Sequence, residues 1–238
     1  LEGTREEVAA ISKVVPSAQT QQLLGEHALE AAVKSELERA AVIHIATHGY
    51  FANDLDEDLT NDSSRGESLG PRQTSSMLAA RNPLLQCGLT LAGCNCDVWV
   101  DANGLPVDGG QDGYLSAEEI MGMDLGKARL VVLSACETGL GNIGSGEGVF
   151  GLQRALHISG VKSTIASGWK VDDRATQQLM TEMYRRMFAD KLTPADALHA
   201  AQLRVLRQFN PQTGQLDERN AKPAPPYYWA AFSLSGAF

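Results

Sequence analysis

A histidine and a cysteine each follow an apolar, β-branched segment of this 238-residue chain. His48 comes directly after residues 41–47, and Cys136 directly after residues 129–135. A thiol attacks a carbonyl when a nearby imidazole removes its proton or protonates the leaving amine. Glycines follow both residues, and they let a peptide backbone approach closely. The pair therefore fits either nucleophilic catalysis or, taken residue by residue, a buried thiol and a core histidine.

The two segments are predicted strands, because each is short and rich in β-branched residues. Further strands are expected at residues 21–24, 88–92, 161–167 and 227–236. Helices are expected at residues 4–15, 28–39, 116–123, 149–158 and 172–188, and from Thr193 onward. Residues 52–76, 93–113 and 210–226 are polar or rich in Gly and Pro and are predicted loops. Strands that alternate with helices indicate an α/β fold of three layers, with a mostly parallel sheet covered on both faces.

This predicted fold places His48 and Cys136 together. In parallel sheets covered by helices, sites form at the carboxyl ends of the strands. Both residues lie at such ends, so they can face each other although they are far apart in the sequence.

Composition excludes several classes of function. There are 20 basic against 29 acidic residues, and the net charge of −9 argues against a nucleic-acid partner. No apolar run approaches the roughly 18 residues of a membrane span, and the first residues do not resemble a signal peptide. Four cysteines (87, 94, 96 and 136) are too few and too clustered for a disulfide scaffold. A cytoplasmic, reduced protein is expected.

Several motifs together resemble the CHAT family, caspase-like peptidase domains that are usually joined to tetratricopeptide repeats. The two main blocks are Ile43–Phe51, which reads IHIATHGYF, and Val131–Gly139, which reads VVLSACETG. The resemblance continues through residues 112–119, 146–152, 169–173 and 227–232. It implies a caspase-like α/β/α fold in the clan that also holds separase and the gingipains.

The resemblance also implies roles for individual residues. Cys136 is the expected nucleophile, which forms a thioester, and His48 is expected to protonate the leaving amine and later to help activate water. The backbone N–H groups of Gly49 and Cys136 are the expected oxyanion hole. No metal and no cofactor are needed for this chemistry.

An acidic pair is expected to select the substrate. Separase has a similar Trp-x-Val-x-Asp segment whose final Asp lines the pocket for a basic side chain, and Asp173 holds that position here, beside Asp172. The resemblance therefore implies cleavage after Arg or Lys. For Asp172, capping of the following helix is an equally good interpretation.

The family's usual organisation predicts what lies around this domain. Residues 1–238 correspond to one peptidase domain, expected to be a piece of a longer chain without its first strand and its repeat domain. The expected partners are a protein substrate and a regulatory repeat domain, with no nucleic acid and no membrane. Some relatives act in bacterial defence. The main alternative is a caspase-like interaction domain without activity.

Other enzyme classes fit the sequence less well. Gly146-x-Gly148-x-x-Gly151 matches a dinucleotide-binding pattern, but about ten residues separate it from the preceding strand. His44 and His48 stand roughly 13 Å apart on a strand, which is too far for a shared zinc ion. Ser134 lacks the glycines of a hydrolase elbow. Cys87, Cys94 and Cys96 are expected to be free thiols, and His27, His157 and His199 surface side chains.

Overall fold

The computed structural model describes residues 2–51, 87–94, 111–134, 147–169, 171–219 and 222–237. Cys136 and Cys96 lie outside these ranges, as do the predicted loop at 52–76 and most of the one at 93–113.

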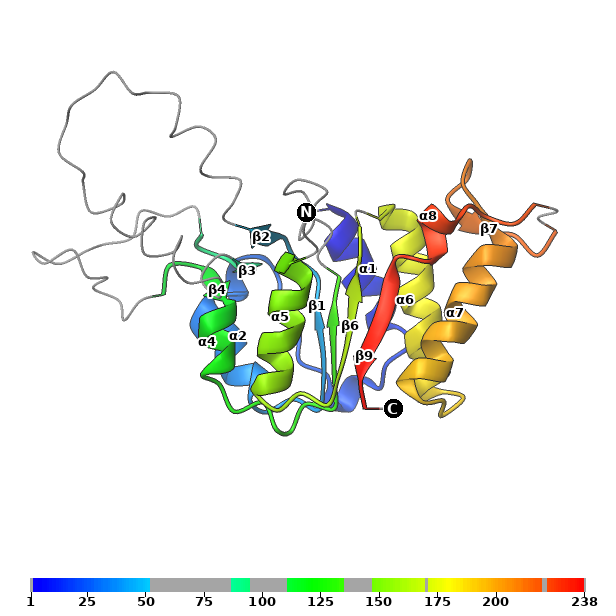
Figure 1. Cartoon of the computed structure of the whole chain (residues 1–238). Helices are drawn as coiled ribbons and strands as arrows, with labels where there is room; N and C mark the ends of the chain where they lie inside the picture. The colour runs from blue at the N-terminus through cyan, green and yellow to red at the C-terminus, as the bar shows by residue number, and fades with distance from the viewer. Residues whose placement is uncertain are drawn as a thin grey trace, which may run out of the picture.

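The main sheet has four strands: β1 (Val42–Ile45), β5 (Leu130–Leu133), β6 (Ser163–Ser167) and β9 (Phe232–Gly236). Their order is β1-β5-β6-β9, with β1, β5 and β6 parallel and β9 antiparallel to β6 (Figure 1). Every residue of β5 and β6 is buried, as expected for central strands covered on both faces. The predicted mostly parallel sheet is confirmed.

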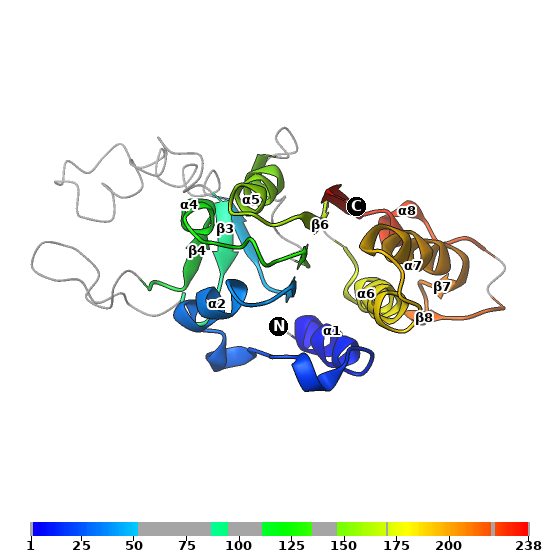
Figure 2. The ribbon, with the colours of Figure 1, turned by 90° about the horizontal axis from the view of Figure 1, so that it is seen from below.

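Helices cover this sheet on both sides, and Figure 2 shows the two sets separated by the strands. One face carries α2 (Glu30–Leu37), α4 (Ala117–Met121) and α5 (Glu147–Ile158); the other carries α1 (Glu2–Ser12), α6 (Asp173–Phe188) and α7 (Pro194–Gln208). Successive residues of β5 divide between the two cores, Leu130 and Val132 on the α6 side and Val131 and Leu133 on the α5 side. The three-layer architecture is confirmed.

Two helices, α4 and α7, begin where the sequence predicts them. Ser116 and Glu119 form a reciprocal capping box at α4. Thr193 caps α7, and Pro194 occupies its first turn. These local signals fix where α4 and α7 begin. None of the described helices is long and apolar enough to cross a bilayer.

A second, antiparallel sheet was not expected. It consists of β2 (Gly49–Phe51), β3 (Cys87–Thr90) and β4 (Tyr114–Ser116). Placing residues 88–92 in the parallel sheet was therefore wrong. Gly88 allows this pairing, because a Cβ there would lie 2.6 Å from Tyr50 Oη and 2.5 Å from the backbone oxygen of Leu115. β2 is short and starts with glycine, so a search for runs of β-branched residues does not detect it.

Three further expectations need correction. Residues 21–24 form no strand, and this part of the chain reaches a strand-like pairing only at Leu29, which bridges Ala92. Residues 227–236 divide into a helical turn, α8 (Pro226–Trp229), and β9, since a proline favours the first turn of a helix. The predicted loop at 210–226 contains β8 (Gln215–Leu216), which pairs with β7 (Phe209–Asn210). Short 3-10 turns occur at Ser17–Gln19 and Gly25–His27.

Candidate active site

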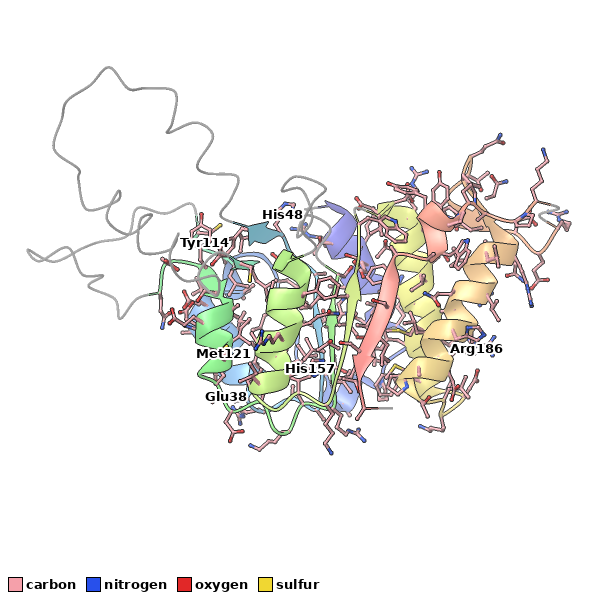
Figure 3. All side chains as sticks on the ribbon, in the orientation of Figure 1. Glu38, His48, Tyr114, Met121, His157 and Arg186 are labelled. Atoms are coloured by element: carbon pink, nitrogen blue, oxygen red, sulfur yellow. The ribbon has the colours of Figure 1, made fainter. Side chains whose placement is uncertain are left out.

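His48 lies between the two sheets, after the end of β1 and immediately before β2 (Figure 3). Its backbone carbonyl accepts hydrogen bonds from the N–H of Thr90 at 2.9 Å and from Thr90 Oγ1 at 3.1 Å. Thr47 Oγ1 in turn donates to the Thr90 carbonyl at 2.6 Å. The small sheet therefore fixes the backbone that carries His48. The sequence did not single out Thr90, because its role depends on a strand pairing with no local signal.

Gly49 has a backbone suited to its expected role. In the β2–β3 ladder it lies opposite Leu89, next to the hydrogen-bonded His48–Thr90 pair. Hydrogen-bonded and non-hydrogen-bonded pairs alternate in antiparallel ladders, so the N–H of Gly49 faces away from β3. This donor is directed out of the ladder rather than into it.

The end of β5 lies beside the end of β1. Ile45 pairs with Leu133, and the N–H of Ser134 donates to the carbonyl of Ile45 at 2.8 Å, which extends the parallel ladder by one residue. Ser134 comes two residues before Cys136 in the sequence, and Ile45 comes three residues before His48. The described register thus brings the two chain segments that lead to the expected dyad to the same edge of the sheet.

The two acidic residues occupy different positions at the start of α6. Asp172 is the N-cap, and its Oδ1 accepts a hydrogen bond from the N–H of Ala175 at 2.9 Å, so the capping interpretation is confirmed for this residue. Asp173 is exposed in the first turn. Its carboxylate lies over Gly3 of α1, where a Cβ would come within 2.5 Å of Asp173 Oδ2. The Asp173 side chain lies beyond the carboxyl end of β6, and among the described residues it makes no ion pair.

Cys87 and Cys94 are the cysteines within the described residues. Cys87 is buried in β3, and burial raises the pKa of its thiol to about 11. A thiol with such a pKa stays protonated at neutral pH and is a poor nucleophile. Cys94 is half-buried and free. The expectation of free thiols is confirmed for these two residues, and Cys96 lies outside the described ranges.

One histidine expected at the surface has a structural role. His157, near the end of α5 (Figure 3), has its Nδ1 3.0 Å from the carbonyl of Val161 and its Nε2 3.1 Å from Ser235 Oγ of β9. The surface interpretation was therefore wrong for His157, which links α5 to the edge strand. His27 and His199 are exposed, as expected.

Comparison with known proteins and families tests the resemblance to the CHAT family. No curated protein matches this sequence. The family model of the CHAT domain, which belongs to the caspase-like peptidase clan, matches residues 1–237, and the parallel sheet between two helical layers agrees with that fold. The chain therefore belongs to the CHAT domain family.

Proposed function

We propose that this domain is a cysteine endopeptidase in which His48 and Cys136 form the catalytic dyad. The observation that supports this best is the parallel register of β1 and β5, extended by the bond from the Ser134 N–H to the Ile45 carbonyl. Two strands aligned in this way deliver the following residues to one edge, where α/β proteins hold their sites.

The proposed chemistry needs only groups of the chain and a water molecule. His48 takes the proton of the Cys136 thiol as the sulfur attacks the scissile carbonyl, and the oxyanion accepts hydrogen bonds from the N–H groups of Gly49 and Cys136. His48 gives a proton to the leaving amine as the C–N bond breaks, which leaves a thioester. Water then attacks the thioester while His48 takes a proton from it. The Cys136 thiolate leaves, the acid product is released, and His48 returns the proton to the sulfur. The outward N–H of Gly49 suits this role.

The labelling test uses a peptide chloromethylketone with Arg next to the reactive group. We expect covalent labelling that mass spectrometry maps to Cys136, because alkylation needs both the thiolate and a bound side chain. His48→Ala should slow this labelling strongly, and an equivalent probe with a neutral side chain should react slowly. If Cys94 or Cys87 is labelled at the same rate as Cys136, Cys136 is not the activated thiol and an interaction domain without activity is favoured.

We also propose that the substrate is a protein cut after Arg or Lys. The exposed carboxylate of Asp173 supports this preference, since it lies beyond the end of β6, next to the strand that leads to Cys136. Carboxylates recognise guanidinium and ammonium groups through charge-assisted hydrogen bonds. Asp172 contributes negative charge while one of its oxygens caps α6. The net charge of −9 further favours a basic substrate segment.

Asp173→Asn is expected to reduce kcat/KM about 10- to 100-fold for Arg and Lys peptides and to leave neutral peptides unchanged. The reason is that the substitution removes the charge and keeps the size of the side chain. Asp172→Asn is the matched control, because asparagine is also a good N-cap and should have a smaller effect. Equal losses on basic and neutral peptides would show that Asp173 acts on the structure and not on specificity.

The wider setting is part of the proposal. By similarity to other CHAT domains, a tetratricopeptide-repeat module in the same chain or in a partner would control the peptidase, which would act in the cytoplasm in bacterial defence. Comparing the labelling rate with and without such a module tests this control.

A further inference from the structure

A line of buried and half-buried polar side chains connects four elements beneath the candidate site. Ser134 Oγ, just after β5, donates to Glu7 Oε2 of α1 at 3.0 Å. Glu7 Oε1 lies 3.2 Å from His44 Nε2 of β1. His44 Nδ1 lies 3.1 Å from Tyr184 Oη of α6. We call these four residues the Glu7 cluster.

Burial of the Glu7 cluster costs free energy, because its polar groups are removed from water. Glu7 and Ser134 are each 5% exposed, and Tyr184 is 2% exposed. A carboxylate removed from water costs several kcal/mol unless partners compensate for the loss. Within the described part of the chain, Glu7 Oε1 and His44 Nε2 have no hydrogen bond of good geometry, although they lie 3.2 Å apart. Their contact is therefore electrostatic rather than directional, and Ser134 supplies the one well-aligned bond to the carboxylate.

The phenol at the far end of the cluster stays protonated. Burial raises the pKa of Tyr184, and the negative charge of Glu7 raises it further. A protonated phenol can donate to His44 Nδ1, which lies 3.1 Å from Tyr184 Oη.

The positions of these contacts in the sheet are unusual. His44 precedes His48 by four residues on β1, and Ser134 precedes Cys136 by two residues after β5. A single carboxylate thus contacts both of the neighbouring strands that lead to the proposed dyad. Among the described residues, the other two buried carboxylates are placed differently: Glu30 binds Lys34 and the N–H of Gly113, and Glu182 binds arginines of α6 and α7.

We propose that Glu7 is a positioning residue, which sets the relative placement of the ends of β1 and β5 and thereby of His48 and Cys136. This proposal rests on the proposed function. The backbone ladder between β1 and β5 aligns the strands, and the Glu7 cluster adds a side-chain restraint at the point where the ladder ends, at Ser134. A displacement of about 1 Å at reacting groups costs on the order of 100-fold in rate, so a restraint at this point matters for catalysis.

The test compares Glu7→Gln, Ser134→Ala and the double variant in the whole domain. Each single variant should lower kcat about tenfold with KM unchanged, because the restraint acts on the dyad and not on substrate binding. The double variant should be no slower than the slower single variant, since both remove the same contact. Glu6→Gln is the matched control, because it makes the same change at an exposed position of the same helix and should leave kcat unchanged.

A second measurement separates this proposal from the proposed function. The alkylation rate of Cys136 by iodoacetamide, followed by mass spectrometry, needs no peptide cleavage. Glu7→Gln and Ser134→Ala should slow it several-fold at pH 7, because the thiol then lies less favourably toward the imidazole. If wild type cleaves no peptide but the variants still slow alkylation, Glu7 positions the thiol although the proposed function fails.

Two results would overturn the positioning role. One is an alkylation rate and a kcat equal to those of wild type in both single variants. The other is a double variant whose losses are the product of the single losses, which would indicate independent effects on stability. Circular dichroism establishes whether each variant folds, and if Glu7→Gln does not, Ser134→Ala decides the question by its alkylation rate and kcat.

Discussion

Cys136→Ala should abolish cleavage of fluorogenic Arg and Lys peptides while the domain stays folded. Loss of the nucleophile removes the covalent route, and comparable substitutions in hydrolases lower the rate by about 10³-fold or more. His48→Ala should lower it by about 10²- to 10⁴-fold, the range expected for a general acid or base. The measurement is kcat/KM on one peptide, together with thermal unfolding of each variant.

Cys94→Ala is the matched control, because it removes a free and half-buried thiol from the small-sheet side of the molecule. It should leave kcat/KM unchanged. Cleavage by Cys136→Ala at the wild-type rate would show that Cys136 is not the nucleophile. If His48→Ala cleaves the peptide as fast as wild type, the imidazole takes no part in the mechanism.

Glu182→Gln is expected to destabilise the domain by about 2 to 4 kcal/mol at pH 7. Glu182 of α6 is buried with 3% of its side chain exposed, and it binds Arg185 at 2.9 Å, Arg186 at 2.7 Å and also Arg204 of α7. Removing the carboxylate leaves three guanidinium groups near one another at the contact between these helices. Urea unfolding gives the difference in the free energy of unfolding.

The same carboxylate makes stability depend on pH. Burial on its own would raise the pKa of Glu182, but hydrogen bonds from Arg185 and Arg186 and the charge of Arg204 outweigh it and lower the pKa to about 2. The ordinary value is 4.5. A lowered pKa stabilises the folded state above pH 4.5, and this contribution disappears as the pH falls through 2. It amounts to about 2 kcal/mol after allowance for the partly exposed arginines, and more than half of it is lost by about pH 3.

The difference between wild type and Glu182→Gln should therefore shrink from pH 7 to pH 3. Glu38→Gln, at an exposed position after α2, is the matched control and should change stability by less than about 0.5 kcal/mol at both values. A difference for Glu182→Gln that is the same at pH 7 and pH 3 would contradict the lowered pKa.

Local patterns predicted the layers well and the second sheet poorly. The apolar runs of β1, β5 and β6 and the caps at Ser116 and Thr193 are visible in the sequence, because strand propensity and capping depend on neighbouring residues. The β2–β3 pairing depends on residues distant in the chain and on Gly88 giving room to Tyr50. A sequence contains no local signal for such a contact.

Part of the candidate site could likewise be predicted from the sequence. His48, the position of Gly49 and the start of α6 follow from strand ends and a helix cap. Thr90 and Glu7 were not found, since each acts across sequence distances that only the folded chain brings together. Glu7 lies four residues before Ile11 in the predicted helix, on the same face, but a charged residue type gave no reason to expect burial against β1 and β5.

The first helix also bears on how the domain matures during translation. Glu7 and Ser134 are separated by 127 positions, and the carbonyl of Glu6 accepts a hydrogen bond from Gln177, 171 positions further on. A nascent chain therefore leaves α1 without these partners until α6 has been synthesised. If Glu7 places the dyad as proposed, the strand ends reach their final alignment only when most of the domain has emerged from the ribosome. A peptidase built in this way would stay inert for most of its own synthesis.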